Sequence, residues 1–138
     1  MNQQNCQILK LKSIFYKYIK VEGLINTTIK LKYKIEGISW RAPERDWVAL
    51  NTDGSMVELG SNAACRGILR DSDSCFLVAF AARLHNVSVL EAKLWGIYHG
   101  LKLAWERGFR KIIVYSDSLI AINLLKDGCP SLILYVPL

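Results

Sequence analysis

The stretch Ser88–Tyr115, SVLEAKLWGIYHGLKLAWERGFRKIIVY, decides the fold. Its apolar residues recur at steps of four and three, as on one face of a helix: Leu90, Leu94, Ile97, Leu101 and Ala104. Ser88 and Glu91 have the spacing of a capping box, and Gly108 is placed to end the helix. The β-branched run Lys111–Tyr115 then predicts a strand.

The segments on either side complete the pattern. Trp47–Asp53 is apolar and predicts a strand that stops at Gly54–Ser55. Ala63–Arg70 and Cys75–Ala82 predict two more strands, and the short polar link between them is typical of an antiparallel hairpin. Ser118–Lys126 predicts a second helix. A long helix between two strands requires a crossover, so the last strand should lie parallel to an earlier one. We therefore expect an α/β fold with a mixed sheet, three antiparallel strands plus a parallel strand, and packed helices.

The composition excludes several classes of protein. A chain of 138 residues with 51% hydrophobic residues is a single globular domain rather than a disordered or multidomain protein. No apolar run is long enough to span a membrane, and the first residues lack the pattern of a secretory signal. The four cysteines are scattered without a C-x-x-C pair, which argues against a zinc site and a disulfide framework. We expect an intracellular protein, in the nucleus or the cytoplasm, with no membrane partner and no small-molecule cofactor.

The positive charge is concentrated near the N-terminus. Residues 1–40 contain seven Lys against two Glu, whereas residues 41–138 contain eleven Lys and Arg against ten Asp and Glu. An anionic partner such as nucleic acid would explain this asymmetry, and a solubilising linker would explain it equally well. With a break near Pro43, the sequence predicts a basic arm or linker at 1–39, a domain at 40–128 and an apolar tail at 129–138.

Two carboxylates follow apolar strands. Asp53 ends the first predicted strand and Asp117 ends the fourth. If these strands are parallel neighbours, both carboxylates emerge at the same edge of the sheet, where a divalent cation would relieve their repulsion. Oxygen ligands of this kind suit Mg²⁺ or Mn²⁺. A turn role for Asp53 and a helix-cap role for Asp117 explain the same residues without a metal.

Four strings, in this order, resemble one family: Leu50–Ser55 (LNTDGS), Gly67–Asp71 (GILRD), Leu94–Ala104 (LWGIYHGLKLA) and Ser116–Ser118 (SDS). Together they resemble the RNase H type-1 domain, in the form found in plant retroelement-derived reverse transcriptase proteins. The resemblance covers Trp40–Gly128, about two thirds of the chain.

The resemblance implies a five-stranded mixed sheet that binds RNA–DNA hybrids and hydrolyses the RNA strand. Two Mg²⁺ ions held by four carboxylates would activate the attacking water and stabilise the leaving oxygen. Asp53 and Asp117 match the first and third of these catalytic and metal-binding carboxylates. The resemblance also implies a nucleic-acid-binding role for the residues around them: Asn51, Thr52, Gly54, Ser55 and Ser118.

The sequence departs from the family at the second carboxylate, a Glu that stands seven residues before a Gly-Leu pair. That position is Lys93 here. Glu91 is close in sequence, but two residues of a helix turn it about 200° away from position 93. Position 93 shares its side of the helix with Gly96 and Gly100, and the capping box already explains Glu91. We expect Lys93 to point at the metal site and Glu91 to point away from it.

The fourth carboxylate is also missing, because the tail at 129–138 contains no acidic residue. We therefore expect a C-terminally truncated RNase H-like domain of retroelement origin that binds nucleic acid and has impaired hybrid cleavage. The alternatives are a non-catalytic nucleic-acid-binding module and a decayed gene fragment. Without a fifth strand, Lys111–Tyr115 would be an open sheet edge unless the tail covers it, so self-association is expected.

Overall fold

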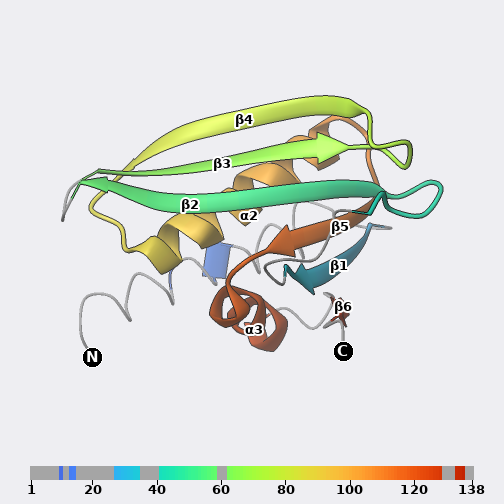
Figure 1. The fold of residues 1–138 in the computed structure, drawn as a ribbon. Coiled ribbons are helices and arrows are strands. Elements are labelled where there is room, and N and C mark those ends of the chain that lie inside the picture. Colours follow the sequence, from blue (N-terminus) through green and yellow to red (C-terminus); the bar gives the residue numbers. More distant parts are fainter. Residues whose placement is uncertain are drawn as a thin grey trace.

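The computed structural model describes residues 10, 13–14, 27–34, 41–58, 62–128 and 133–135. Within these ranges the strands form one six-stranded sheet in the order β4-β3-β2-β5-β1-β6 (Figure 1). The elements are β1 (Thr28–Tyr33), β2 (Val48–Glu58), β3 (Asn62–Arg70), β4 (Phe76–His85), α2 (Val89–Glu106), β5 (Lys111–Ser116), α3 (Leu119–Gly128) and β6 (Ile133–Tyr135).

The strands β2, β3 and β4 form the antiparallel half of the sheet, and the predicted hairpin is confirmed. In its turn the Asp71 carboxylate accepts hydrogen bonds from the backbone N–H groups of Asp73 and Cys75, both at 2.9 Å. The prediction that the first strand stops at Gly54–Ser55 is wrong. Gly54 pairs with Cys65 inside the ladder, so β2 continues to Glu58.

The parallel half contains more strands than the sequence predicted. β5 pairs in parallel with β2 on one side and with β1 on the other, and β6 pairs with β1. β1 lies in the segment assigned to the arm, where Ile29 and Leu31 are 2% and 0% exposed and belong to the core. The mixed α/β fold class is therefore confirmed, whereas the single parallel strand is wrong.

The expected open edge at β5 is also wrong, because β1 occupies it. The expectation of self-association through that edge loses its structural basis. Apart from residues 10, 13–14 and 27–34 of the predicted arm and β6 in the predicted tail, these two segments lie outside the described residues.

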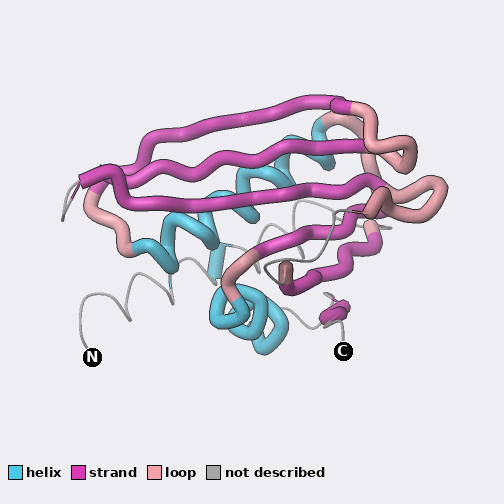
Figure 2. Tube along the Cα trace, in the orientation of Figure 1, coloured by secondary structure: helices cyan, strands magenta, loops and turns pink. Residues whose placement is uncertain are grey.

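The helix α2 covers one face of the antiparallel strands, as Figure 2 shows, and contacts β2 and β3. Its predicted capping box is confirmed: the Ser88 hydroxyl accepts from the Glu91 N–H, and the Glu91 carboxylate accepts from the Ser88 N–H, each at 3.1 Å. Gly108 follows the helix with φ of +88°, a conformation that glycine adopts without strain, and its N–H donates to the Trp105 carbonyl at 3.0 Å.

The core lies between α2, α3 and the sheet and is built from alternate strand residues and the apolar stripe of α2. Its fully buried side chains include Leu31, Leu50, Leu94, Ile97, Leu101, Val114 and Ile122. No helix within the described ranges is long and apolar enough to cross a membrane.

The helix α2 approaches the sheet closely at glycine positions. A Cβ added to Gly54 would lie 2.5 Å from the Ala92 carbonyl carbon and from the Lys93 backbone nitrogen. A Cβ on Gly100 would lie 2.5 Å from a methyl carbon of Leu50. Gly54 therefore faces α2, and its neighbour Asp53 faces the opposite side of the sheet, since successive strand residues alternate.

Candidate functional site

A cleft of about 370 Å³ lies where β2 and β5 part. The two strands are parallel neighbours, as the sequence predicted, and their pairing ends at Asn51 opposite Tyr115. Asp53 and Asp117 stand two residues beyond this last pair, so both carboxylates come to the same side and both line the cleft. The side chains around them include Lys34, Asn51, Thr52 and Arg66.

Asp53 is partly paired and partly open to solvent. Its Oδ1 accepts a hydrogen bond from the Gly54 N–H at 2.9 Å. Its Oδ2 lies 3.7 Å from the guanidinium of Arg66, the residue directly opposite on β3. The Asp53 side chain is 44% exposed and the Arg66 side chain 77%, so solvent screens this ion pair and leaves it weak.

Asp117 is paired with a lysine from the helix. The Lys93 ammonium lies 3.0 Å from Asp117 Oδ1, and the Lys93 side chain is only 19% exposed. Because the neighbouring backbone of α2 rests on Gly54, the start of this side chain is fixed relative to β2. The Lys93 ammonium therefore lies beside Asp117, one of the two carboxylates that were predicted from the sequence to bind a metal.

Glu91 occupies a different place from Lys93. It is 3% exposed, and its carboxylate accepts from the Ser88 N–H in the capping box. Lys93, two residues further along α2, instead donates to the Asp117 carboxylate at 3.0 Å. The helix rotation that the sequence predicted thus separates position 91 from position 93.

The residues expected to touch nucleic acid divide into two groups. Asn51 and Thr52 line the cleft, and Ser55 is exposed on β2. Gly54 is buried beneath α2, and the Ser118 hydroxyl accepts from the Ala121 N–H at 3.1 Å, which caps α3. Gly54 and Ser118 therefore have structural roles in addition to any contact with a ligand.

Two cations of the cleft, Arg66 and Lys34, were not predicted as site residues from the sequence. Arg66 follows from the antiparallel pairing of β2 with β3, which places it directly across from Asp53. Lys34 follows β1, whose alternation of apolar and basic residues was the available signal. With Lys93, these residues bring three positive charges near two carboxylates.

Tyr115 adds no negative charge beside the cleft. It pairs with Asn51 across β2 and β5, and burial raises the pKa of its phenol above the ordinary value. The hydroxyl therefore stays protonated at neutral pH, and the balance of charge in the cleft rests on the two aspartates and the three cations.

The described residues do not fit a resident two-metal centre. They contain no group of three or more His, Cys, Asp or Glu side chains that could hold a metal ion. Each of the two cleft carboxylates already has a cationic neighbour, Arg66 for Asp53 and Lys93 for Asp117. A divalent cation at either carboxylate would therefore lie close to one of these positive side chains.

Residues 51–131, more than half of the chain, match the reverse transcriptase-like family. An Arabidopsis thaliana protein named as a candidate ribonuclease H protein is 34% identical over 91 residues, which cover 66% of this chain and 15% of that protein. This chain therefore matches only a small part of its relative's length.

Two solved structures show the same fold. RNase H1 of Halobacterium salinarum superposes with a TM-score of 0.53 at 17% identity, over 66% of this chain and 85% of that one. A second, LC11-RNase H1 from compost, solved in complex with an RNA/DNA hybrid, gives 0.52 at 12% identity, over 65% and 84%. The family match, the Arabidopsis relative and this shared fold agree with the resemblance found in the sequence, and the chain belongs to the reverse transcriptase-like family as an RNase H-like domain of plant retroelement type.

Proposed function

We propose that this domain binds RNA–DNA hybrid across the cleft between β2 and β5, and that its cleavage of the RNA strand is impaired. The observation that carries the proposal is the 3.0 Å contact between the Lys93 ammonium and Asp117. The hybrid-bound structure of LC11-RNase H1, which shares the fold, supports the choice of ligand.

The charge balance explains the impairment. A pair of divalent cations carries four positive charges, and Asp53 and Asp117 supply two negative ones. Lys93 contributes a further positive charge beside Asp117. A contact between unit charges at 4 Å is worth about 4 kcal/mol at an effective dielectric constant of 20, so a repulsive contact here strongly weakens metal binding. Mg²⁺, or Mn²⁺ in its place, would have to displace the ammonium from Asp117 before it could bind there.

Hybrid binding uses groups that do not need a metal. Arg66 presents an exposed guanidinium at the rim of the cleft. Guanidinium groups bind phosphates through bidentate hydrogen bonds. The Asn51 side-chain Nδ2 has no hydrogen-bond partner within the described part of the chain, although it is buried and its residue lines the cleft. An oxygen of the nucleic acid is a suitable acceptor for this amide.

The test combines binding and cleavage on one substrate. Fluorescence anisotropy with a labelled RNA–DNA hybrid, in EDTA and in Mg²⁺, should show binding in both conditions, and a denaturing gel should show little cleavage. Lys93→Glu should gain Mg²⁺-dependent cleavage, while Glu91→Gln, the matched control on the same helix, should behave as the unmodified chain. Absence of hybrid binding would refute the ligand. Robust cleavage by the unmodified chain that is lost in Asp53→Asn would refute the impairment.

A further inference from the structure

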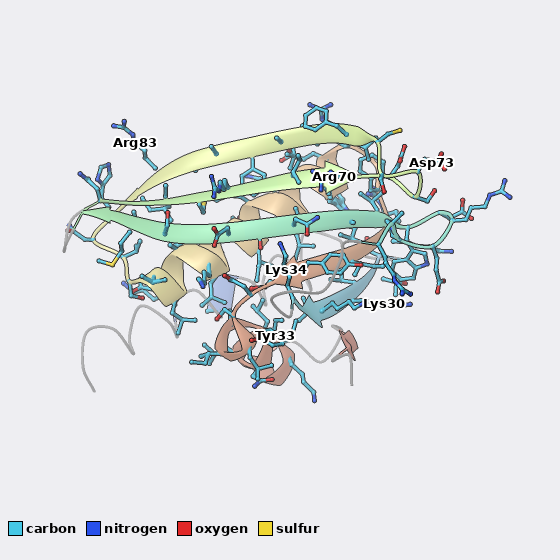
Figure 3. The ribbon with its side chains drawn as sticks, viewed as in Figure 1. Lys30, Tyr33, Lys34, Arg70, Asp73 and Arg83 are labelled. Atoms are coloured by element: carbon cyan, nitrogen blue, oxygen red, sulfur yellow. The ribbon has the colours of Figure 1, made fainter. Side chains whose placement is uncertain are left out.

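The strand β1 presents a row of lysines on the face of the sheet that neither α2 nor α3 covers, here called the uncovered face. Lys30, Lys32 and Lys34 alternate with the buried Ile29 and Leu31. Since strand side chains alternate between faces, the three lysines share the side opposite the core. Figure 3 shows Lys34 and Tyr33 leaving β1 on opposite sides, with Tyr33 directed toward α3.

The first two lysines of this row lie against aromatic rings. The Lys30 ammonium is 4.2 Å from the ring centroid of Trp47, and the Lys32 ammonium is 5.5 Å from that of Tyr115. Cation–π contacts of this kind hold the side chains against the sheet while leaving their charge in place. The side chains of Lys30 and Lys32 are therefore held at defined positions on the surface of the sheet.

Lys34 brings the row to the cleft. Its backbone N–H donates to the Ser116 carbonyl at 2.8 Å, which fixes it next to Asp117, and its side chain lines the cleft. Lys34 is exposed, and among the described residues it has no ion-pair partner. A lysine that is positioned by its backbone and forms no ion pair with a described carboxylate is available to an anionic ligand.

The uncovered face is basic beyond β1. Strand pairing places other cations on the same side as Lys34: Arg66, Arg70, Arg83 and Lys111. The carboxylates of the cleft, Asp53 and Asp117, lie among these cations. A polyanion that crosses this face would meet positive charge on β1, β3, β4 and β5.

We propose that the lysine row, Lys30–Lys32–Lys34, is a track for the phosphate backbone of the bound nucleic acid, and that Lys34 holds a phosphate at the rim of the cleft. This inference rests on the proposed hybrid binding and adds the residues that would bind the phosphate backbone of the nucleic acid next to the cleft. The family match begins at residue 51, so the track belongs to a segment outside it.

The salt dependence of binding tests the track. Hybrid affinity should be measured by anisotropy over a series of KCl concentrations, in EDTA, for Lys34→Gln and for Lys126→Gln. Lys126, an exposed lysine on α3, is the matched control. Lys34→Gln should weaken binding about tenfold at low salt and reduce the slope of log affinity against log salt by about one unit, as loss of one phosphate contact requires. Lys126→Gln should change neither quantity, and Lys34→Arg should retain the slope.

The outcomes separate the two proposals. If Lys34→Gln behaves as Lys126→Gln while the unmodified chain binds hybrid, the track is refuted and hybrid binding stands. If the unmodified chain binds no hybrid, both are refuted. The exposed side chain of Lys34 makes an unchanged melting curve the expected result for its variants. Lys30→Gln, which removes the other end of the row, should also lower the slope and provides a second, independent reading.

Discussion

The two faces of the sheet are built from the same strands but differ in exposure and charge. On the face covered by helices, Leu31, Leu50 and Val114 are each 0% exposed. On the open face, the Asp53 and Arg66 side chains are 44% and 77% exposed. Because strand residues alternate, β1, β2, β3 and β5 each contribute both to the core and to the charged surface. Substitutions on the covered face should therefore change stability, whereas those on the open face should change binding.

Lys93 links the two faces. It starts from α2, on the covered side, and reaches Asp117 beside the cleft. Gly54 makes this possible, since the backbone at Ala92 and Lys93 occupies the space that a side chain at position 54 would need. The packing of α2 on Gly54 therefore determines that the Lys93 ammonium lies beside Asp117 in the cleft.

The largest effect should come from removing β1. Deletion of residues 1–39 takes Ile29 and Leu31 out of the core and uncovers the edge of β5, so the fragment should lose cooperative unfolding. Deletion of residues 1–26 leaves β1 in place and should retain a cooperative transition. Thermal unfolding followed by circular dichroism distinguishes the two. A 40–138 fragment that melts like the full chain would show that β1 adds nothing to the sheet.

A smaller but still large effect is expected at the contact between α2 and β2. Gly54→Ala places a Cβ against helix backbone that cannot move alone, and overpacking of this kind costs about 1–3 kcal/mol. The control is Gly96→Ala, where the nearest atoms are 3.4 Å away and alanine favours the helix by about 1 kcal/mol. Urea unfolding should show a lower free energy of unfolding for the first and an unchanged or higher one for the second. Equal losses in both variants would contradict the close approach at Gly54.

The smallest effect on stability is expected on the open face. Arg66→Gln removes an exposed ion pair and should change the free energy of unfolding by less than about 0.5 kcal/mol. The same variant should lower hybrid affinity, because it removes a cation from the cleft. Urea unfolding and anisotropy on the same sample provide both numbers. A large loss of stability with unchanged affinity would reverse the roles assigned to the two faces.

Much of the central domain could be predicted because its signals are local. The period of α2, its capping box and the crossover to β5 together placed Asp53 near Asp117, and the helix rotation separated Glu91 from Lys93. Gly54 was interpreted as a strand end because glycine in a turn and glycine under a packed helix look alike in sequence. Only the position of α2 distinguishes the two cases.

β1 could not be predicted for a different reason. The segment Thr28–Tyr33 is only six residues long, so its alternation of apolar residues and lysines is a weak signal on its own. Its strand conformation depends on pairing with β5, which lies about eighty residues away in the chain. Lys34 was missed with it, since its place in the cleft follows from that pairing.

Calorimetric titration with Mg²⁺ tests the central claim, that the Lys93 ammonium takes the place of a metal beside Asp117. The unmodified chain should show no saturable binding at low millimolar Mg²⁺, and Glu91→Gln should match it. Lys93→Glu should bind Mg²⁺ with a saturable heat, because a carboxylate replaces the ammonium next to Asp53 and Asp117. Saturable Mg²⁺ binding by the unmodified chain, lost in Glu91→Gln, would contradict the account and make Glu91 the ligand.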